Sequence, residues 1–245
     1  MRKILGFILS PLTLIAFLLV LLIFQPIQWL CLKLGGYSAH KKSVDILNFW
    51  LTSTLYLTGN TVTFINKQNL PTNRPIIFVA NHQSLLDIPP LIYHLRKYHA
   101  KFISKIELTR NIPSISFNLK HGGGANIDRK DPRQSIMELS KLGTRMKENT
   151  WSTVIFPEGT RSKNGKVKTF QAAGIATIFK KCPDALLVPI AINNSWKIVQ
   201  YGFYPLNTFI PMTLEVLSPI ERGTATVDEI VLQAENAIKT ALKQS

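Results

Sequence analysis

The sequence is poor in cysteine, and its histidines are scattered. Its two cysteines among 245 residues, Cys31 and Cys182, provide neither a disulfide framework nor a metal-ligand spacing. The five histidines form no pair at the intervals typical of zinc sites. These absences exclude a small domain held together by disulfides or zinc. We expect a reduced protein with no metal site and no cofactor.

Acidic residues are also scarce. Fourteen Asp and Glu against 29 Lys and Arg give a net charge of +15, and the stretch from Arg96 to Lys181 alone holds 18 basic and 6 acidic residues. This balance predicts an anionic partner, which could be nucleic acid, an anionic membrane surface or a phosphorylated substrate. No recognition helix and no aromatic residues interleaved with the basic ones accompany the charge, so we expect no nucleic acid.

The chain begins with a long hydrophobic run. The 21 residues from Ile4 to Phe24 carry no charge, enough for a helix to cross a hydrocarbon core of about 30 Å. A signal peptide is the alternative, but the run is too long and no small-x-small cleavage site precedes Gln25. Pro11 leaves open a kinked or re-entrant helix that enters one leaflet.

A second helix is expected from Ser43 to Leu57. Val44, Leu47, Leu51 and Leu55 form an apolar stripe with Trp50 beside it, which suits either a core-packing helix or an interfacial one. We therefore predict a membrane-anchoring helical segment over residues 1–57 and an α/β domain over residues 58–245. Basic residues flank the hydrophobic run on both sides and leave its topology open. We expect a membrane-associated protein with its catalytic domain on the cytoplasmic face.

Short apolar runs alternate with helical patterns beyond Thr58, which predicts an α/β fold with a mixed sheet flanked by helices. The predicted strands are Thr61–Ile65, Pro75–Ala80, Lys101–Ile103, Ala125–Ile127, Thr153–Phe156, Leu186–Ile192 and Met212–Leu217. The predicted helices are Ile88–Leu95, Asp131 to about Asn149, Phe170–Lys181, and one that starts at the capping box of Thr226 and Glu229.

A histidine and an aspartate follow the second predicted strand. His82 and Asp87 are five residues apart, so on a regular helix they would lie about 140° apart and could not meet. A turn that starts at Ser84, with either Ser84 or Asp87 as the helix cap, would bring the carboxylate to one imidazole nitrogen. The other nitrogen would then be free to act as a general base. A packed histidine beside a capping aspartate is the alternative interpretation.

A second polar block follows the strand predicted at Thr153–Phe156. Gly159 allows the backbone to approach a ligand, Thr160 offers a hydroxyl, and Arg161 offers a planar fork suited to phosphate. A salt-bridged surface turn would explain the same residues if the two blocks were unrelated.

Together the two blocks resemble the glycerolipid acyltransferase family, which includes the lysophosphatidate acyltransferases. The resemblance rests on four blocks that span about Pro75 to Ile192: Asn81–Asp87 (NHxxxxD), Phe156–Ser162 (FPEGTRS), Lys105 to Arg129, and Val188–Ile190. Two positions depart from the family pattern. Ser114 and its neighbours stand where a glycine is usual, and Phe170 is followed by glycine one residue later than usual. These departures leave the shape of the acyl and acceptor tunnel, and hence the substrate, open.

The resemblance implies transfer of a fatty acyl group from acyl-CoA or acyl carrier protein to the free hydroxyl of a lysophosphatidate, giving phosphatidate. His82 would be the base and Asp87 its partner, while Arg161, with Gly159 and Thr160, would hold the acceptor phosphate. Glu158 would orient Arg161 or a hydroxyl. Lys105 and Arg129 match family positions and would add positive charge near the phosphate or the oxyanion; as solvated surface charges they would do neither. The alternatives are another acceptor, such as glycerol-3-phosphate or another lyso-lipid, and a non-catalytic phospholipid-binding module.

Overall fold

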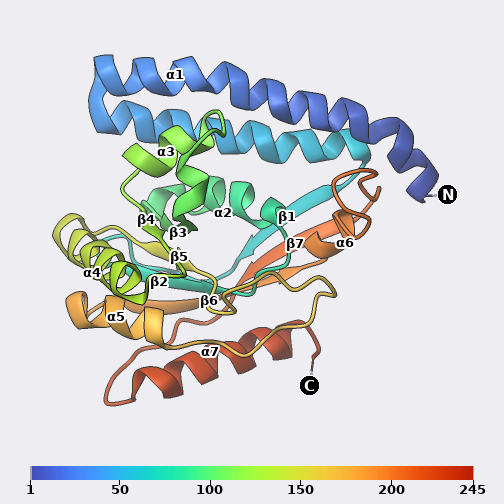
Figure 1. Ribbon diagram of the computed structural model, residues 1–245. Helices are drawn as coiled ribbons and strands as arrows, with labels where there is room; N and C mark the ends of the chain where they lie inside the picture. The colour runs from blue at the N-terminus through green and yellow to red at the C-terminus, as the bar shows by residue number, and fades with distance from the viewer. Residues whose placement is uncertain (1, 245) are drawn as a thin grey trace.

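The computed structural model describes residues 2–244. It shows an α/β fold whose mixed β-sheet lies beneath a long helical hairpin (Figure 1). The strands are β1 (Thr61–Asn66), β2 (Ile76–Ala80), β3 (Lys101–Lys105), β4 (Ala125–Ile127), β5 (Thr153–Ile155), β6 (Leu186–Asn193) and β7 (Pro211–Val216). The helices are α1 (Arg2–Ser53), α2 (Ile88–His94), α3 (Ile115–His121), α4 (Pro132–Asn149), α5 (Ala173–Lys181), α6 (Ser195–Ile198) and α7 (Val227–Ala241). The predicted fold class and every predicted strand are confirmed, within a residue or two at their ends.

Within the described residues the strand order is β1-β7-β6-β2-β5-β3-β4. β6, β2, β5, β3 and β4 run parallel, whereas β7 is antiparallel to β6. β2 therefore lies between β5 and β6, and Val79 is in register with Ile155. Because parallel strands end at the same edge of a sheet, the segments that follow β2, β5 and β6 meet there.

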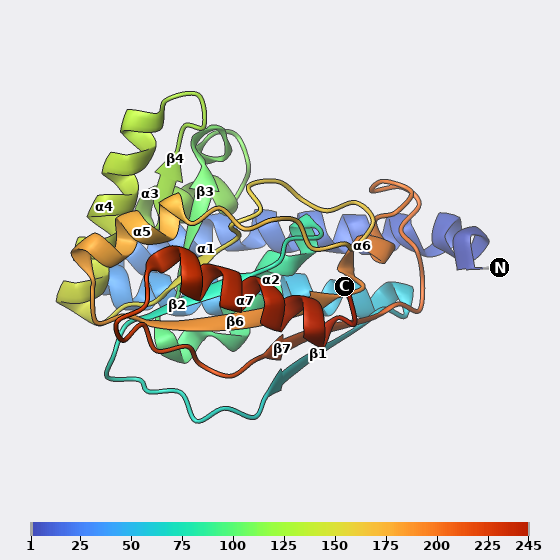
Figure 2. The ribbon, with the colours of Figure 1, turned by 90° about the horizontal axis from the view of Figure 1, so that it is seen from below.

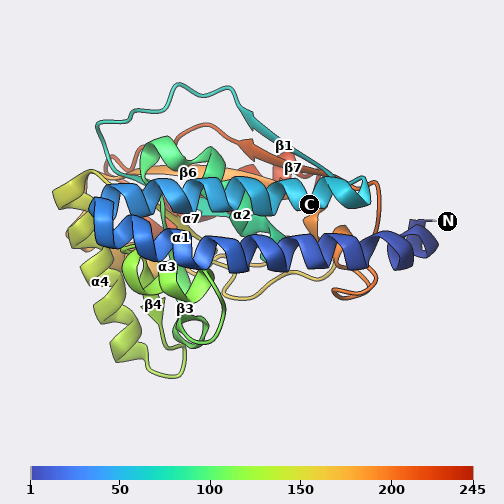
Figure 3. The same ribbon diagram turned by 90° about the horizontal axis from the view of Figure 1, so that it is seen from above.

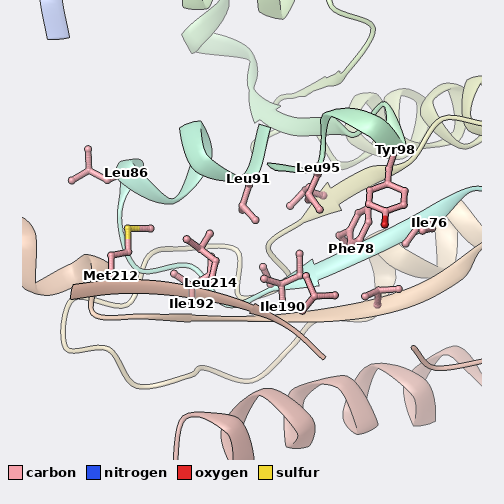
Figure 4. Close-up of a cluster of buried hydrophobic side chains, with 14 of the residues drawn as sticks. Ile76, Phe78, Leu86, Leu91, Leu95, Tyr98, Ile190, Ile192, Met212 and Leu214 are labelled. Atoms are coloured by element: carbon pink, nitrogen blue, oxygen red, sulfur yellow. The ribbon is translucent and has the colours of Figure 1, made fainter. Parts of the chain in front are cut away.

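The sheet has a separate core on each face. On one face Leu91 of α2 and Leu95, the residue after this helix, share a buried cluster with Ile190 and Leu214 (Figure 4). On the other face α4, α5 and α7 cover the sheet (Figure 2), with Ile178 and Ile238 among the fully buried side chains that meet it. All residues of β2 are buried, as expected for a central strand covered on both sides.

The N-terminal hydrophobic run does not end at Phe24. α1 continues to a bend at Gly36 and returns, so its two arms lie side by side over the α2 face of the sheet (Figures 1 and 3). Gly36 has φ 64° and ψ −162°, a conformation essentially restricted to glycine. The second arm includes the helix predicted at Ser43–Leu57, whose last residues form a 3₁₀ turn from Thr54 to Thr58.

Pro11 lies inside α1 without breaking it. A proline cannot donate to the carbonyl four residues earlier, which here is that of Phe7. The hydroxyl of Tyr204 donates to this carbonyl at 3.4 Å. The segment around Tyr204 thus packs on the first turns of α1, where the backbone of Leu206 leaves no room for a side chain at Gly6.

Ser114 explains one departure from the family pattern. It has φ 60°, a region that favours glycine. The serine is fully buried and ties the start of α3 to α1 by three hydrogen bonds: its N–H donates to Gln25, its hydroxyl donates to the carbonyl of Leu21, and its own carbonyl accepts from Gln28. The contacts with α1 thus hold a conformation that glycine would adopt more easily.

Candidate active site

The predicted turn between His82 and Asp87 is present. Ser84 caps a 3₁₀ turn over Leu85–Asp87 and forms a capping box with Asp87, so the first of the two capping alternatives holds. The turn brings Nδ1 of His82 within 2.9 Å of Oδ2 of Asp87. That contact assigns the ring proton to Nδ1 and leaves Nε2 as the unprotonated nitrogen of the neutral ring.

Asp87 is fully buried and well supplied with donors. Besides His82, its Oδ2 accepts from the backbone N–H groups of Gln83 at 2.7 Å and Ser84 at 2.9 Å. Its Oδ1 accepts from the hydroxyl groups of Ser195 and Ser84. A buried carboxylate is tolerated when its oxygens are hydrogen-bonded in this way. Ser195 was not predicted, and its position directly beyond β6 is the only sequence signal that could have identified it.

The imidazole of His82 is held between β2 and β5. Its ring stacks on Phe156, with centroids 4.1 Å apart and planes at 18°. Its backbone N–H donates to Oε1 of Glu158 at 3.1 Å, and its carbonyl accepts from the N–H of Ser162 at 2.7 Å. These contacts follow from the register of the two strands, and they bring the two polar blocks together as predicted.

Glu158 has a different role from the expected one. Its side chain points to the backbone of His82, and within residues 2–244 it has no hydrogen bond or ion pair to Arg161. Its other oxygen, Oε2, is buried without a partner among the described residues. Burial raises the pKa of Glu158 to about 7, although the His82 N–H opposes the shift. The structure therefore does not pair Glu158 with Arg161, and the alternative expectation, that Glu158 orients a hydroxyl, stays a prediction.

The turn after Glu158 is open to solvent. Gly159 has φ 69°, and the space that a Cβ would occupy there is empty to a distance of 4 Å. Thr160 and Arg161 are exposed. Lys168, which was not predicted, donates to the Thr160 hydroxyl at 2.9 Å and to the Arg161 carbonyl at 3.0 Å. The turn, tied to His82 by the Ser162 N–H, exposes Thr160 and Arg161, whose hydroxyl and guanidinium are donors that suit a phosphate.

Lys105 and Arg129 lie farther along the same edge of the sheet. Both are exposed, Lys105 at the end of β3 and Arg129 two residues beyond β4. Strand β5 lies between β2 and β3. At the usual strand spacing, the backbones of β2 and β3 are therefore about 10 Å apart. The structure thus brings His82, Asp87 and Glu158–Arg161 together, and leaves Lys105 and Arg129 at the margin of the site.

An apolar cavity of about 260 Å³ lies between the hairpin and the α/β domain. Leu85 and Leu86, which follow His82 closely in the chain, line it, and so does Tyr37 beside the hairpin bend. Lys101 also lines it, with its ammonium group 4.3 Å from the ring centroid of Trp151, and burial lowers the pKa of this lysine to about 7. A cavity with this apolar lining suits a hydrocarbon chain.

A model of the Acyltransferase family matches residues 61–193, more than half of the chain, and this range includes His82, Asp87 and Glu158–Arg161. The chain belongs to this family. Of the curated relatives, this acyltransferase is 36% identical over 136 residues to the chloroplastic 1-acyl-sn-glycerol-3-phosphate acyltransferase of Arabidopsis thaliana, a match that covers 55% of this chain and 36% of that protein. It is 26% identical over 209 residues to human 1-acyl-sn-glycerol-3-phosphate acyltransferase beta, covering 85% of this chain and 74% of that one.

Among solved structures, the fold matches that of the 1-acyl-sn-glycerophosphate acyltransferase PlsC of Thermotoga maritima. The TM-score is 0.77 at 23% identity, and the match covers 99% of this chain and 98% of the other. The matched region spans only 36–41% of the length of three plant and algal relatives. The family and the fold of the acyltransferase are thus established independently of its substrate.

Proposed function

We propose that the chain transfers a fatty acyl group from a thioester donor, acyl-CoA or acyl carrier protein, to the free hydroxyl of 1-acyl-glycerol-3-phosphate, giving phosphatidate in phospholipid biosynthesis. The observation that carries the proposal is the His82–Asp87 pair. Nδ1 of His82 contacts Asp87, and Nε2 of His82 makes no hydrogen bond within residues 2–244. The pair lies beside a phosphate-suited turn and an apolar cavity. The names of the relatives support the same acceptor.

The chemistry follows from the two imidazole nitrogens. Nε2 takes the proton of the acceptor hydroxyl as its oxygen attacks the thioester carbonyl, and Asp87 stabilises the imidazolium that forms. The tetrahedral intermediate then expels the thiolate, which accepts the proton from His82. Acyl transfer by this route needs no covalent enzyme intermediate. Arg161, with Gly159 and Thr160, holds the phosphate of the acceptor, while Lys105 and Arg129 add positive charge at the edge of the site.

The test is thiol release by purified, detergent-solubilised protein. Acyl-CoA and acyl carrier protein are each offered with 1-acyl-glycerol-3-phosphate, glycerol-3-phosphate and a lyso-lipid whose phosphate is masked. We expect release to be fastest with 1-acyl-glycerol-3-phosphate and to be lost in His82→Ala. Faster release with another acceptor would reassign the substrate. No release with any acceptor would favour a phospholipid-binding module.

Arg161→Lys tests the phosphate site. The variant keeps the charge but loses the bidentate geometry, so the acceptor KM should rise about tenfold, with a smaller change in the donor KM and in kcat. Its preference for the phosphate-bearing acceptor over the masked one should also fall. An unchanged preference would place the phosphate elsewhere, at Lys105 or Arg129.

We also propose that residues 1–57 attach the α/β domain, residues 58–245, to one leaflet of a membrane. α1 is long and apolar enough to span a bilayer, but its two arms lie flat on the domain (Figure 3). Both arms expose large hydrophobic side chains: Ile4, Ile8, Leu12, Ile15, Leu18, Leu19, Leu22, Ile23, Trp29, Leu30, Leu34, Ile46, Phe49 and Trp50. A soluble thioester donor would then reach the site from the cytoplasmic face.

A further inference from the structure

Asp87 takes a donor from a distant part of the chain. The contacts to its Oδ2 all come from the turn that contains it: Nδ1 of His82 and the backbone N–H groups of Gln83 and Ser84. Its Oδ1 accepts from Ser84 only at 3.4 Å, and its close partner is the hydroxyl of Ser195. Ser195 is therefore the one strong side-chain donor to Oδ1 within residues 2–244.

The fold delivers Ser195 to this position. It is the first residue of α6 and follows β6, the strand paired with β2. Asn194, between the end of β6 and Ser195, has φ 67°, and its side chain donates to the carbonyl of Pro211 at 2.9 Å. This left-handed residue, of a type that tolerates the conformation, turns the chain so that the buried Ser195 hydroxyl faces the carboxylate.

The proton of the Ser195 hydroxyl has two acceptors within reach. Oδ1 of Asp87 is much closer than Oε1 of Gln83, which lies at 3.4 Å and also accepts weakly from the N–H of Trp196 at 3.5 Å. The Ser195 hydroxyl therefore donates to the carboxylate, because a close charged acceptor forms a stronger hydrogen bond than a distant neutral one. Ser195 has no exposed surface and faces the carboxylate, so it is not placed to act as a nucleophile.

We propose that Ser195 is a positioning residue for acyl transfer, which holds the Asp87 carboxylate through Oδ1 so that Oδ2 stays aligned with Nδ1 of His82. The proposal rests on the proposed function only for the role of His82 as the base. Without this donor the buried Oδ1 keeps only the long contact to Ser84. Its negative charge is then less dispersed, so the carboxylate attracts the imidazolium more strongly.

Ser195→Ala should therefore change the chemical step rather than binding. A hydrogen bond to a charged group is worth enough to lower kcat about tenfold near neutral pH. The KM values of both substrates should stay within about twofold. The acidic limb of the kcat profile should move to higher pH by about half a unit. Ser195→Cys, a weaker donor of similar size, should give an intermediate result and covers the case in which the alanine variant fails to fold.

Ser152→Ala is the matched control. Ser152 is as buried as Ser195, and its hydroxyl accepts from the N–H of Ile76 at 3.1 Å, at the opposite end of β2 from His82. Its loss should lower thermal stability without moving the pH profile. In addition, Ser195→Ala should cost nothing further in an Asp87→Asn background, because the two side chains then act as one unit.

A second measurement does not need activity. The charged groups on the segments that contact the pair are Glu158, which accepts from the His82 N–H, Arg161 and Lys168 on the loop after β5, and Lys197 on α6. The ring of His82 is followed by NMR with ¹⁵N-labelled histidine, using His82→Gln to assign its signal. The titration is repeated in a Glu158→Gln background, because Glu158 itself titrates near pH 7.

Ser195→Ala should move the titration midpoint of His82 upward in both backgrounds. If it does while no acceptor supports thiol release, the positioning role stands and the proposed function is wrong. If the midpoint and the kcat profile both match those of the wild type and of Ser152→Ala, Ser195 is a packing residue and the inference is overturned. An equal loss in the wild-type and Asp87→Asn backgrounds would overturn it as well.

Discussion

Two carboxyl groups flank His82, and their surroundings give them different states. Asp87 has donors on both oxygens, which favour the charged form. The Oε1 atom of Glu158 accepts from the His82 N–H, whereas its Oε2 is buried without a partner in the described residues, so burial dominates and the pKa of Glu158 rises to about 7. The charged partner of the imidazole is thus Asp87, while Glu158 supports the backbone of the same residue.

The first prediction concerns this pair. His82→Ala should leave a folded protein whose kcat falls by about 10²–10⁴-fold, because that is the usual contribution of a general base. Asp87→Asn should lose a large part of the same factor, since an amide copies the shape of the carboxylate but not its charge. His121→Ala is the control and should keep full activity, because His121 is an exposed residue at the end of α3. Near wild-type turnover in folded His82→Ala would contradict the mechanism.

Glu158 leads to a prediction about stability. Its pKa in the folded state is about 7 against 4.5 for the free side chain, so between these values the folded protein binds more protons than the unfolded one. The free energy of unfolding therefore falls as pH rises through this window. Glu158→Gln keeps the acceptor for the His82 N–H and cannot ionise. Above about pH 7 it should be more stable than the wild type, by up to about 3 kcal/mol.

The extra stability of Glu158→Gln should vanish as pH approaches 4.5, where folded wild type and variant both carry a neutral side chain at position 158. Urea unfolding in detergent at several pH values measures it. Glu148→Gln, at an exposed position near the end of α4, is the control and should give a flat difference. A stability difference for Glu158→Gln that does not vary with pH would show that the pKa of Glu158 is the same in the folded and unfolded protein, and would contradict the prediction.

At the scale of elements, the sequence predicted where each strand lies in the chain better than it predicted which strands pair in the sheet. Each strand is a compact apolar run, so it could be located, and both polar blocks could be placed at strand ends. The strand order was not predictable, because it depends on contacts between residues such as Asn81 and Ile192 that are 111 positions apart. For the same reason Ser195 was missed. The helix predicted from Phe170 begins only at Ala173, and the N–H groups of Phe170 and Gln171 donate instead to Glu235 of α7 and to the carbonyl of Pro157.

α7 also holds the loop that follows Arg161. Gln244, just beyond α7, accepts from Val167 at 2.8 Å and donates to the carbonyl of Gly165 at 2.9 Å. Gln244→Ala removes two neutral hydrogen bonds of about 1 kcal/mol each. We expect the acceptor KM to rise about 3–10-fold, with little change in kcat, because the turn bearing Arg161 is less well ordered. Gln233→Ala, at an exposed position on α7, should have no effect. An unchanged KM would show that the loop is ordered without this contact.

At the scale of the whole molecule, apolar and polar surfaces are segregated. The exposed hydrophobic side chains are concentrated on α1, with others at Tyr201, Phe203 and Tyr204 in the segment that packs on its first turns. α7, on the opposite face of the sheet, alternates buried with exposed positions in the usual amphipathic pattern (Figure 1). Large contiguous apolar surfaces mark sites of membrane or protein contact, whereas the charge of +15 could act on any anionic surface.

The last prediction separates these two contributions to membrane binding. Leu18 is 51% exposed on the first arm of α1, and Ile136 is 57% exposed on α4, so Leu18→Glu and Ile136→Glu make the same kind of change on different faces. We expect Leu18→Glu to weaken flotation with phosphatidylcholine vesicles severalfold and Ile136→Glu to leave it unchanged. Wild-type binding should survive about 1 M salt, where the Debye length is only about 3 Å, because burial of apolar area does not depend on screening. Loss of wild-type binding at high salt, or equal effects of the two substitutions, would show that the basic surface and not the hairpin attaches the protein to the membrane.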